Sequence, residues 1–200
     1  MRIFDCFMFC DEEMLLDIRL NILNKFVDKF IIVESVYTHS GKKRDLVFNI
    51  ENYKKFKDKI KYYVVNEKPN QINNINSEDT KKVKENKIIM NAVWFENTQR
   101  NAINNLLYNA DPNDQIIISD LDEIPNLENI DFNEIKNKLI LFKQKMFYYK
   151  FNLLLDKMSW CGSKSCKKKD LLSPQWLRNI KDKKYPFWRI DTIFSKKKIQ

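Results

Sequence analysis

Apolar runs and a helical apolar pattern alternate in the first part of the chain. A run over residues 3–9 contains one acidic residue, Asp5, and a second run over 30–33 ends at Glu34. Between these runs, apolar residues recur at helical spacing over 14–26. Short uninterrupted apolar runs are typical of strands that are buried on both faces. The pattern therefore predicts a β-α-β unit at the start of the chain.

The helix of this unit is predicted to begin after Asp11, whose side chain can cap it, with Glu12 and Glu13 in the first turn. We expect one apolar stripe of this helix to face the two strands. The stripe comprises Met14, Leu15, Ile18, Ile22, Leu23 and Phe26.

Further elements continue the alternation. A strand is predicted over 60–65, a helix from about Lys87 to Tyr108, and a buried strand over 115–118. The stretch 67–85 has little to bury and predicts an exposed connection. Strands that alternate with helices predict a largely parallel sheet with right-handed crossovers. The expected buried face of the long helix comprises Ile88, Ala92, Phe95, Ile103, Leu106 and Leu107.

The pattern changes after Phe132. Residues 139–155 are rich in aromatic residues and partly alternating, which predicts antiparallel strands added to the sheet. The 200 residues contain no internal repeat and no clear linker, so we expect a single domain over residues 1–200. The predicted fold class is α/β, with a mostly parallel central sheet, flanking helices and antiparallel additions.

The net charge of +9 comes mainly from lysine. Of the 36 basic residues only six are arginines, at positions 2, 19, 44, 100, 178 and 189. Arginine is the residue that makes bidentate contacts with phosphate, so this composition argues against nucleic acid as the partner. Attraction to an anionic membrane or to a phosphate-bearing substrate stays open.

The cysteines do not form a zinc motif. Cys6 and Cys10 form one pair, Cys161 and Cys166 another, and His39 is the only histidine, whereas zinc sites use tighter spacing and supporting histidines. The apolar N-terminus is too short for a secretory signal, and no stretch approaches the ~20 apolar residues that span a bilayer. We therefore expect a cytoplasmic protein with reduced thiols.

The most informative stretch is Asp120-Leu121-Asp122, which follows a buried strand. Side chains two residues apart in an extended chain project to the same side, so both carboxylates can converge on one ligand. In open α/β sheets, ligands bind beyond the carboxyl ends of strands, and carboxylates there suit Mg²⁺ or Mn²⁺ together with a substrate phosphate. A solvated acidic turn is the alternative interpretation. Asp5 and Glu34, which we expect to end the first two strands, would lie along the same edge.

Several blocks, in this order, resemble glycosyltransferase family 17. They are Ile3–Phe9, the helix over Leu15–Leu23, Val27–Glu34, Ser40-Gly41-Lys42, Gln99–Ile103 and Ile118–Pro125. The family includes β-1,4-mannosyl-glycoprotein 4-β-N-acetylglucosaminyltransferases. The resemblance implies a GT-A type nucleotide-sugar fold, a Mn²⁺ or Mg²⁺ ion, and inverting transfer from a UDP-sugar. The sugar would be N-acetylglucosamine, and the acceptor a glycan or glycolipid.

The resemblance also implies roles for single residues. Asp120 and Asp122 would hold the metal and the diphosphate, with Asp122 the more direct ligand and Asp120 closer to the ribose or sugar. Phe4 and Cys6 fit a plain core equally well, and Asn101 fits an exposed helix face. The residues implied to contact or frame the donor are Phe4, Asp5, Cys6, Glu34, Ser40, Gly41, Lys42, Arg100, Asn101 and Asp120. His39 is interpreted as a loop residue.

An inverting enzyme needs a carboxylate that takes the proton from the acceptor hydroxyl. Glu123 and Asp156 are candidates by residue type. By the resemblance, about residues 1–125 would bind the donor and about 126–200 the acceptor. Family members continue with a glycine- and tryptophan-containing segment and then a histidine. This chain has no glycine after Gly162 and no histidine after His39, so we expect a fragment or a shortened relative.

Two other classes of function stay open. A metal-dependent phosphohydrolase could use the same acids, although phosphatases of the aspartyl type place their nucleophile after the first strand with a partner that Asp5 lacks. A basic module that binds nucleic acid or anionic lipid would account for the charge. Peripheral association with the inner face of a membrane is compatible with the lysine excess.

Overall fold

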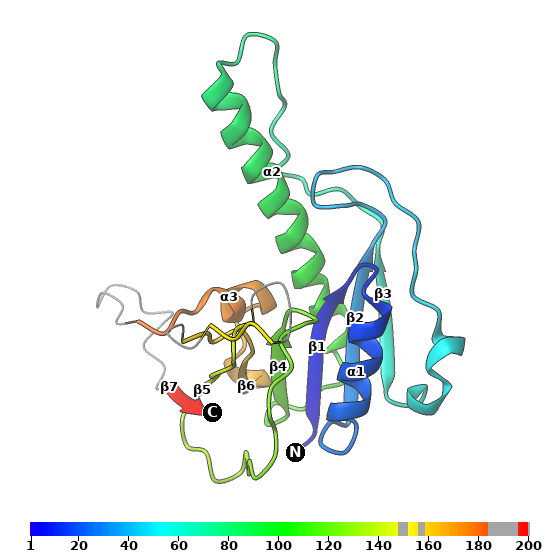
Figure 1. Cartoon of the computed structure of the whole chain (residues 1–200), viewed down its shortest axis with the longest axis vertical. Coiled ribbons are helices and arrows are strands. Elements are labelled where there is room, and N and C mark those ends of the chain that lie inside the picture. Colours follow the sequence, from blue (N-terminus) through cyan, green and yellow to red (C-terminus); the bar gives the residue numbers. More distant parts are fainter. Residues whose placement is uncertain (148–151, 156–158, 184–195, 200) are drawn as a thin grey trace.

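The computed structural model describes residues 1–147, 152–155, 159–183 and 196–199. Within these ranges, seven strands form one sheet in the order β3-β2-β1-β4-β6-β5-β7 (Figure 1). Strands β1 to β4 run parallel, β6 runs antiparallel to β4 and β5, and β7 is parallel to β5. The predicted α/β class with a mostly parallel sheet is confirmed. The strands are β1 (Ile3–Phe9), β2 (Lys29–Ser35), β3 (Ile60–Val65), β4 (Gln115–Ser119), β5 (Leu139–Phe142), β6 (Lys164–Lys167) and β7 (Lys196–Ile199).

Helices cover both faces of the sheet (Figure 1). On one face, Leu16 and Leu20 of α1 pack with Phe7 of β1 in one apolar cluster. On the other face, Ile103 and Leu177 pack with the alternate side chains of β1, β2 and β4 in a second cluster. The helical segments are α1 (Glu13–Leu23), α2 (Lys81–Asn101), α3 (Pro174–Asn179) and the 3₁₀ turns η1 (Ile50–Phe56), η2 (Ala102–Leu106) and η3 (Lys168–Asp170).

The buried stripe predicted for α1 is wrong in part. The helix buries Leu16, Arg19, Leu20 and Leu23 against the sheet, whereas Met14 and Ile22 are 68% and 49% exposed. The cause is Arg19, which turns inward to pair with Asp5 of β1 and so fixes which face meets the sheet. The predicted cap is also wrong, because the N-cap is Glu12 and no side chain caps the helix.

Helix α2 begins earlier than predicted and projects from the body of the molecule (Figure 1). Thr80 caps it by accepting a hydrogen bond from the backbone N–H of Val83. Ile88, predicted to be buried, is 53% exposed because this half of the helix extends beyond the sheet; Ile103 and Leu107, beyond the helix end, are buried as predicted. No helix in the described part of the chain has both the length and the apolar character needed to cross a membrane.

The antiparallel additions predicted over 139–155 are confirmed in part. Strand β5 occupies the first four residues, and beyond it two isolated antiparallel bridges join Gln144 to Trp160 and Phe147 to Leu154. Strand β6 was not predicted, because its sequence Lys164-Ser165-Cys166-Lys167 lacks an apolar run although three of these residues are buried. All four cysteines of the chain are free thiols.

Candidate active site

The Asp120-Leu121-Asp122 motif forms a tight turn directly after β4. Strand β4 ends at Ser119, so the motif lies at the carboxyl end of the central parallel strands. The backbone N–H of Glu123 donates to the Asp120 carbonyl at 3.1 Å, and the Glu123 carboxylate accepts from the Asp120 N–H at 2.9 Å. Glu123 therefore closes the turn and fixes the direction of the two aspartates.

Asp120 is held by two arginines from different helices. Its Oδ1 accepts from Arg100 of α2 at 2.8 Å, and its Oδ2 accepts from Arg178 of α3 at 2.6 Å. Burial raises the pKa of Asp120, but the hydrogen bonds and charges of Arg178 and Arg100 outweigh it and hold the pKa below its ordinary value. Asp120 is thus a fixed carboxylate whose two oxygens are both engaged.

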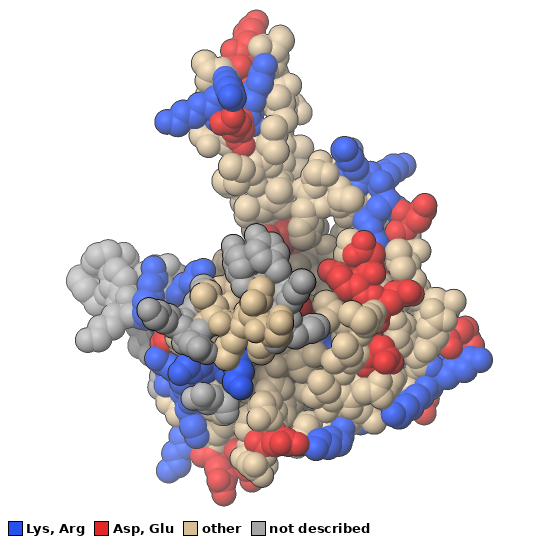
Figure 2. Space-filling model, viewed as in Figure 1, with Lys and Arg blue, Asp and Glu red and all other residues tan. Residues whose placement is uncertain are grey.

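Asp122 is exposed and borders two cavities. A cavity of about 280 Å³ lies on the β1 side of the motif and is lined by Cys10, His39, Arg100 and others. A larger cavity of about 880 Å³ lies on the other side, with Trp160 in its wall. Figure 2 shows a recess at the foot of α2 with acidic side chains inside it. The exposed carboxylate is therefore shared by two spaces in which separate ligands could bind.

The Glu123 carboxylate anchors the motif. It accepts hydrogen bonds from Trp160 Nε1 and from Arg178, both at 3.0 Å, and from the Asp120 N–H, and Glu123 is 8% exposed. Three donors on one carboxylate favour a positioning role over proton transfer. Its assignment as the general base stays a prediction, and Asp156 lies outside the described residues.

Asp5 does not end β1 and does not reach the sheet edge, which corrects the prediction. It lies in mid-strand, fully buried, and both its oxygens accept from Arg19 at 2.6 and 2.8 Å. Phe4 and Cys6 beside it are 3% and 0% exposed, so all three residues belong to the core and cannot touch a nucleotide in this arrangement. At the edge where the motif lies, β1 presents Met8 and residues 9–10.

Arg19 connects this buried pair to the motif. Its Nη1 donates to the backbone carbonyls of Asp120, Leu121 and Glu123 at 3.0–3.1 Å. Asp5 therefore acts on the candidate site indirectly, by holding the arginine that holds the turn. Asp5 is notable in the sequence as an acidic residue within an apolar strand, whereas its partner Arg19 is absent from the predicted buried stripe of the helix.

Glu34 anchors the loop after β2 and does not line either cavity beside Asp122. Its fully buried carboxylate accepts from Arg44 at 2.9 Å, from Tyr62 Oη at 2.7 Å, and from the N–H groups of Val47 and Phe48. Four donors therefore occupy the Glu34 carboxylate, which supports the loop from within, and its role in framing the donor pocket stays a prediction.

The loop residues Ser40, Gly41 and Lys42 form a turn beside the smaller cavity, but the residue of this loop that lines it is His39. Gly41 has a positive φ of 81°, and a Cβ there would lie 3.0 Å from the Phe95 ring. The donor roles of these three residues stay predictions. His39, which was interpreted as a plain loop residue, faces the candidate site.

Arg100 and Asn101 occupy the last turn of α2. Arg100 lines the smaller cavity, is 1% exposed, and also donates to Glu96 at 2.7 Å, while its Nε has no hydrogen-bond partner among the described residues. An unpaired buried donor is costly, which favours an acceptor on a ligand or water at this place. Asn101 instead accepts from the N–H of Gln175 and links α2 to α3.

The chemistry of the acids fits one divalent cation held by a single carboxylate. Mg²⁺ and Mn²⁺ are commonly bound by one or two carboxylates together with substrate phosphates. Asp122 is exposed and can serve. Both oxygens of Asp120 already accept from arginines, and its assignment as a direct metal ligand stays a prediction. Among the described residues, no group of three acids, histidines or cysteines converges on a metal.

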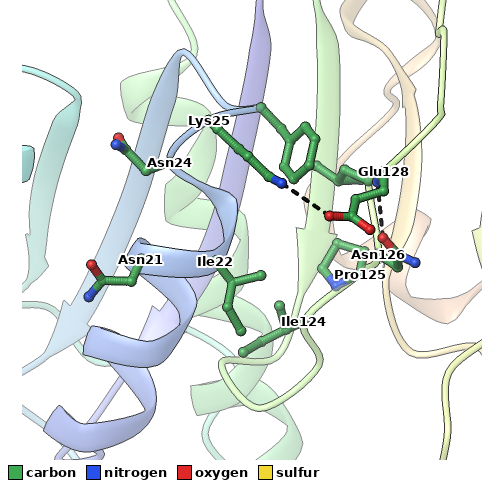
Figure 3. Close-up of a pocket in the computed structure, with 10 residues that line it drawn as sticks. Asn21, Ile22, Asn24, Lys25, Ile124, Pro125, Asn126 and Glu128 are labelled. Atoms are coloured by element: carbon green, nitrogen blue, oxygen red, sulfur yellow. Dashed lines mark hydrogen bonds and ion pairs between the residues drawn. The ribbon is translucent and has the colours of Figure 1, made fainter.

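A third cavity, of about 650 Å³, lies between the end of α1 and residues 124–128 (Figure 3). The charged residues in its wall, Lys25 and Glu128, pair with each other at 3.0 Å across the opening (Figure 3). Because neither aspartate of the motif lines it, we assign it no part in the reaction.

Two residues central to this site were missed by sequence reasoning. Arg178 and Trp160 both bind Glu123, yet they come from the region after residue 155, for which the sequence predicted no element. Burial lowers the pKa of Arg178, but Asp120 and Glu123 raise it by more, so this arginine stays charged. One feature of the sequence could have drawn attention to Arg178: arginine is rare in this chain, with only six among 36 basic residues.

Arg178→Lys is expected to lower the rate of sugar transfer about tenfold with little loss of folding. Arg178 Nη2 donates to both Asp120 and Glu123, and its Nη1 donates to the Gly162 carbonyl. Lysine keeps the charge but lacks the planar group that places donors on all three acceptors. The measurement is the rate constant of transfer, with the melting temperature as a control for folding. An unchanged rate would show that the bridge has no role in placing the motif.

Gly162→Ala is expected to displace the Glu123 anchor. A Cβ at this position would lie 2.2 Å from the Glu123 carboxyl group and 2.6 Å from Trp160 Nε1. Because these groups form the hydrogen bond by which Trp160 holds the Glu123 carboxylate, we expect a destabilisation of about 1–3 kcal/mol and a loss of transfer activity. Denaturant unfolding and a transfer assay test this; wild-type values for both would contradict it.

Lys164 supplies a pH-dependent prediction. Burial, followed by the charge of Arg178, lowers the pKa of Lys164 from 10.5 to about 8. Between these pH values the unfolded chain retains a proton that the folded protein has lost, so stability rises with pH across this window. Between pH 8 and 10.5, the free energy of unfolding of the wild type should rise by up to roughly 3 kcal/mol relative to that of Lys164→Met. Denaturant unfolding across this pH range measures the difference, and a constant difference between the two proteins would contradict the prediction.

Comparison with known protein families identifies the family of this chain. The family model described as glycosyltransferase family 17 matches residues 1–172. The match includes the Asp120-Leu121-Asp122 turn and ends before Arg178. No curated protein matches the chain.

Proposed function

The chain belongs to glycosyltransferase family 17 and so transfers a sugar from a donor to an acceptor, and we propose that it does so from a UDP-sugar with the help of Mn²⁺ or Mg²⁺. The sugar we propose is N-acetylglucosamine, moved with inversion at the anomeric carbon to a glycan or glycolipid. We further propose that the protein acts in the cytoplasm, at the inner face of the membrane.

The observation that carries this proposal is the contrast between the two aspartates. Asp120 is fixed by Arg100 and Arg178, while Asp122 is exposed at the carboxyl end of β4 between two cavities. This is where open α/β sheets bind their ligands. One immobile acid and one accessible acid suit a site in which a cation and a diphosphate enter together.

The charge of the cluster favours a cation. Four carboxylates, Glu96, Asp120, Asp122 and Glu123, surround two guanidinium groups, which leaves a net charge of −2. A bare UDP diphosphate would be repelled by this charge. A divalent ion on Asp122, when bound, would act as a Lewis acid that stabilises the negative charge on the departing diphosphate.

The two cavities suit a reaction with a donor on one side and an acceptor on the other. We assign the donor to the smaller cavity beside β1, which the positively charged Arg100 lines together with both aspartates of the motif. We assign the acceptor to the larger cavity, which the same exposed carboxylate borders. Attack from the opposite side of the anomeric carbon gives inversion.

The structure argues against a phosphohydrolase in which Asp5 is the nucleophile. Asp5 is fully buried and paired through both oxygens with Arg19, so it cannot attack a phosphate. The acid cluster at the end of β4 is therefore better explained by the glycosyl-transfer proposal.

A donor screen tests the proposal. Calorimetry of the wild-type chain with UDP-N-acetylglucosamine, UDP-glucose, UDP-galactose and GDP-mannose is run with Mn²⁺ and again with a chelator. We expect binding of UDP-sugars only with the metal, and the tightest binding for UDP-N-acetylglucosamine. Tighter binding of GDP-mannose, or UDP-sugar binding that is unaffected by the chelator, would contradict it.

A further inference from the structure

The larger cavity beside Asp122 differs in chemistry from one end to the other. Near the motif its wall is polar and aromatic, with Asn126, Gln144 and Trp160. The Trp160 indole is fixed in orientation because its N–H donates to Glu123. The outer part of the wall is apolar and consists of Met146, Phe147, Leu154 and Leu155.

The outer apolar side chains are exposed although they belong to a paired segment. Phe147, Leu154 and Leu155 are 39%, 42% and 41% exposed. Phe147 is bridged to Leu154, and the N–H of Leu155 donates to the Met146 carbonyl at 2.8 Å. Neighbouring apolar side chains held in place beside a cavity indicate an apolar ligand group rather than a free sugar.

Lysines accompany this apolar wall. Within 143–147 and 152–155 the charged residues are Lys143 and Lys145, which are exposed and line the same cavity. Figure 2 shows basic side chains on the side of the molecule where β5, β7 and α3 lie. The outer cavity therefore combines an apolar surface with positive charge, opposite to the acidic motif at its inner end.

Resting on the proposed function, we propose that the acceptor is an amphiphile: a saccharide joined through a phosphate to a hydrocarbon chain. The sugar lies between Trp160 and Asp122, and the phosphate contacts Lys143 and Lys145. The hydrocarbon chain covers the apolar wall of Phe147, Leu154 and Leu155. A free oligosaccharide has no extended apolar group that would cover this wall.

Binding of two matched probes tests this inference without requiring transfer. One probe is N-acetylglucosamine 1-phosphate carrying a dodecyl ester, kept below its micelle concentration, and the other carries a methyl ester instead. We expect the wild type to bind the dodecyl probe at least about tenfold more tightly. Leu154→Ser/Leu155→Ser is expected to lose this preference. The matched control Leu172→Ser, at a side chain that is 60% exposed and outside the cavity, is expected to keep it.

A second variant tests the charge. Lys143→Gln/Lys145→Gln is expected to weaken binding of both probes severalfold without changing the preference for the dodecyl chain, because the phosphate is common to both. Equal affinity of the wild type for the two probes would overturn the inference. A preference that survives in Leu154→Ser/Leu155→Ser would do the same.

Two further measurements distinguish acceptor binding from general membrane binding, and failure of this inference from failure of the proposed function. Binding of the wild type, but not of Leu154→Ser/Leu155→Ser, to plain phosphatidylcholine vesicles would show a general bilayer contact and overturn the acceptor assignment. UDP-sugar binding is measured in the same samples. Its absence from the wild type would contradict the proposed function, whereas absence of a chain preference in a donor-binding protein would contradict this inference alone.

Discussion

Arg19→Met is expected to lower the free energy of unfolding by about 3–5 kcal/mol. The substitution leaves the Asp5 carboxylate without its partner in the core, where both side chains are fully buried. It also removes the donor to the carbonyls of Asp120, Leu121 and Glu123. Since domains of this kind are stable by roughly 5–15 kcal/mol, the variant should be close to unfolding under ordinary conditions.

Denaturant unfolding monitored by circular dichroism measures this loss. The matched control is Lys25→Met, which breaks an ion pair with Glu128 whose partners are 64% and 58% exposed, and is expected to cost less than about 1 kcal/mol. Arg19→Met/Asp5→Leu removes both charges and should recover part of the stability. A loss no greater for Arg19→Met than for the control would show that the buried pair does not stabilise the fold.

The parallel core of the fold could be predicted from the sequence, because its strands coincide with short, mainly apolar runs. Strands β1, β2 and β4 lie where the runs at 3–9, 30–33 and 115–118 were found. Strand β6 was not predicted, because it is buried by its position in the sheet and its sequence is not an apolar run. The start and end of α2 and its projection from the body were not predicted, because its exposed half carries apolar residues like those of a buried helix.

The position of the motif at the end of a strand was predicted correctly, but the residues that hold it there were not. Asp120 and Asp122 lie at the end of β4 as spacing and topology required. The arginines that hold the turn lie far from it along the chain: Arg100, Arg178 and Arg19 are 20, 58 and 101 residues from Asp120. A single sequence cannot pair charges over such distances, so Asp5 was read as a ligand contact when it is a buried support.

Asp122→Asn is expected to reduce sugar transfer by roughly 10²–10³-fold. The amide is nearly the same size but carries no charge, so it holds a divalent cation weakly and leaves the diphosphate charge uncompensated. Because Asp122 is exposed, the substitution should change stability by less than about 0.5 kcal/mol. The matched control is Asp45→Asn, another exposed aspartate, which lines neither cavity beside the motif.

Calorimetric titration of UDP-N-acetylglucosamine into the wild type and Asp122→Asn, with and without Mn²⁺, measures the claimed role of this carboxylate directly. We predict that Mn²⁺ strengthens binding of the sugar nucleotide to the wild type and to Asp45→Asn, and that this gain disappears in Asp122→Asn. Equal Mn²⁺-dependent binding by the wild type and Asp122→Asn would contradict the account.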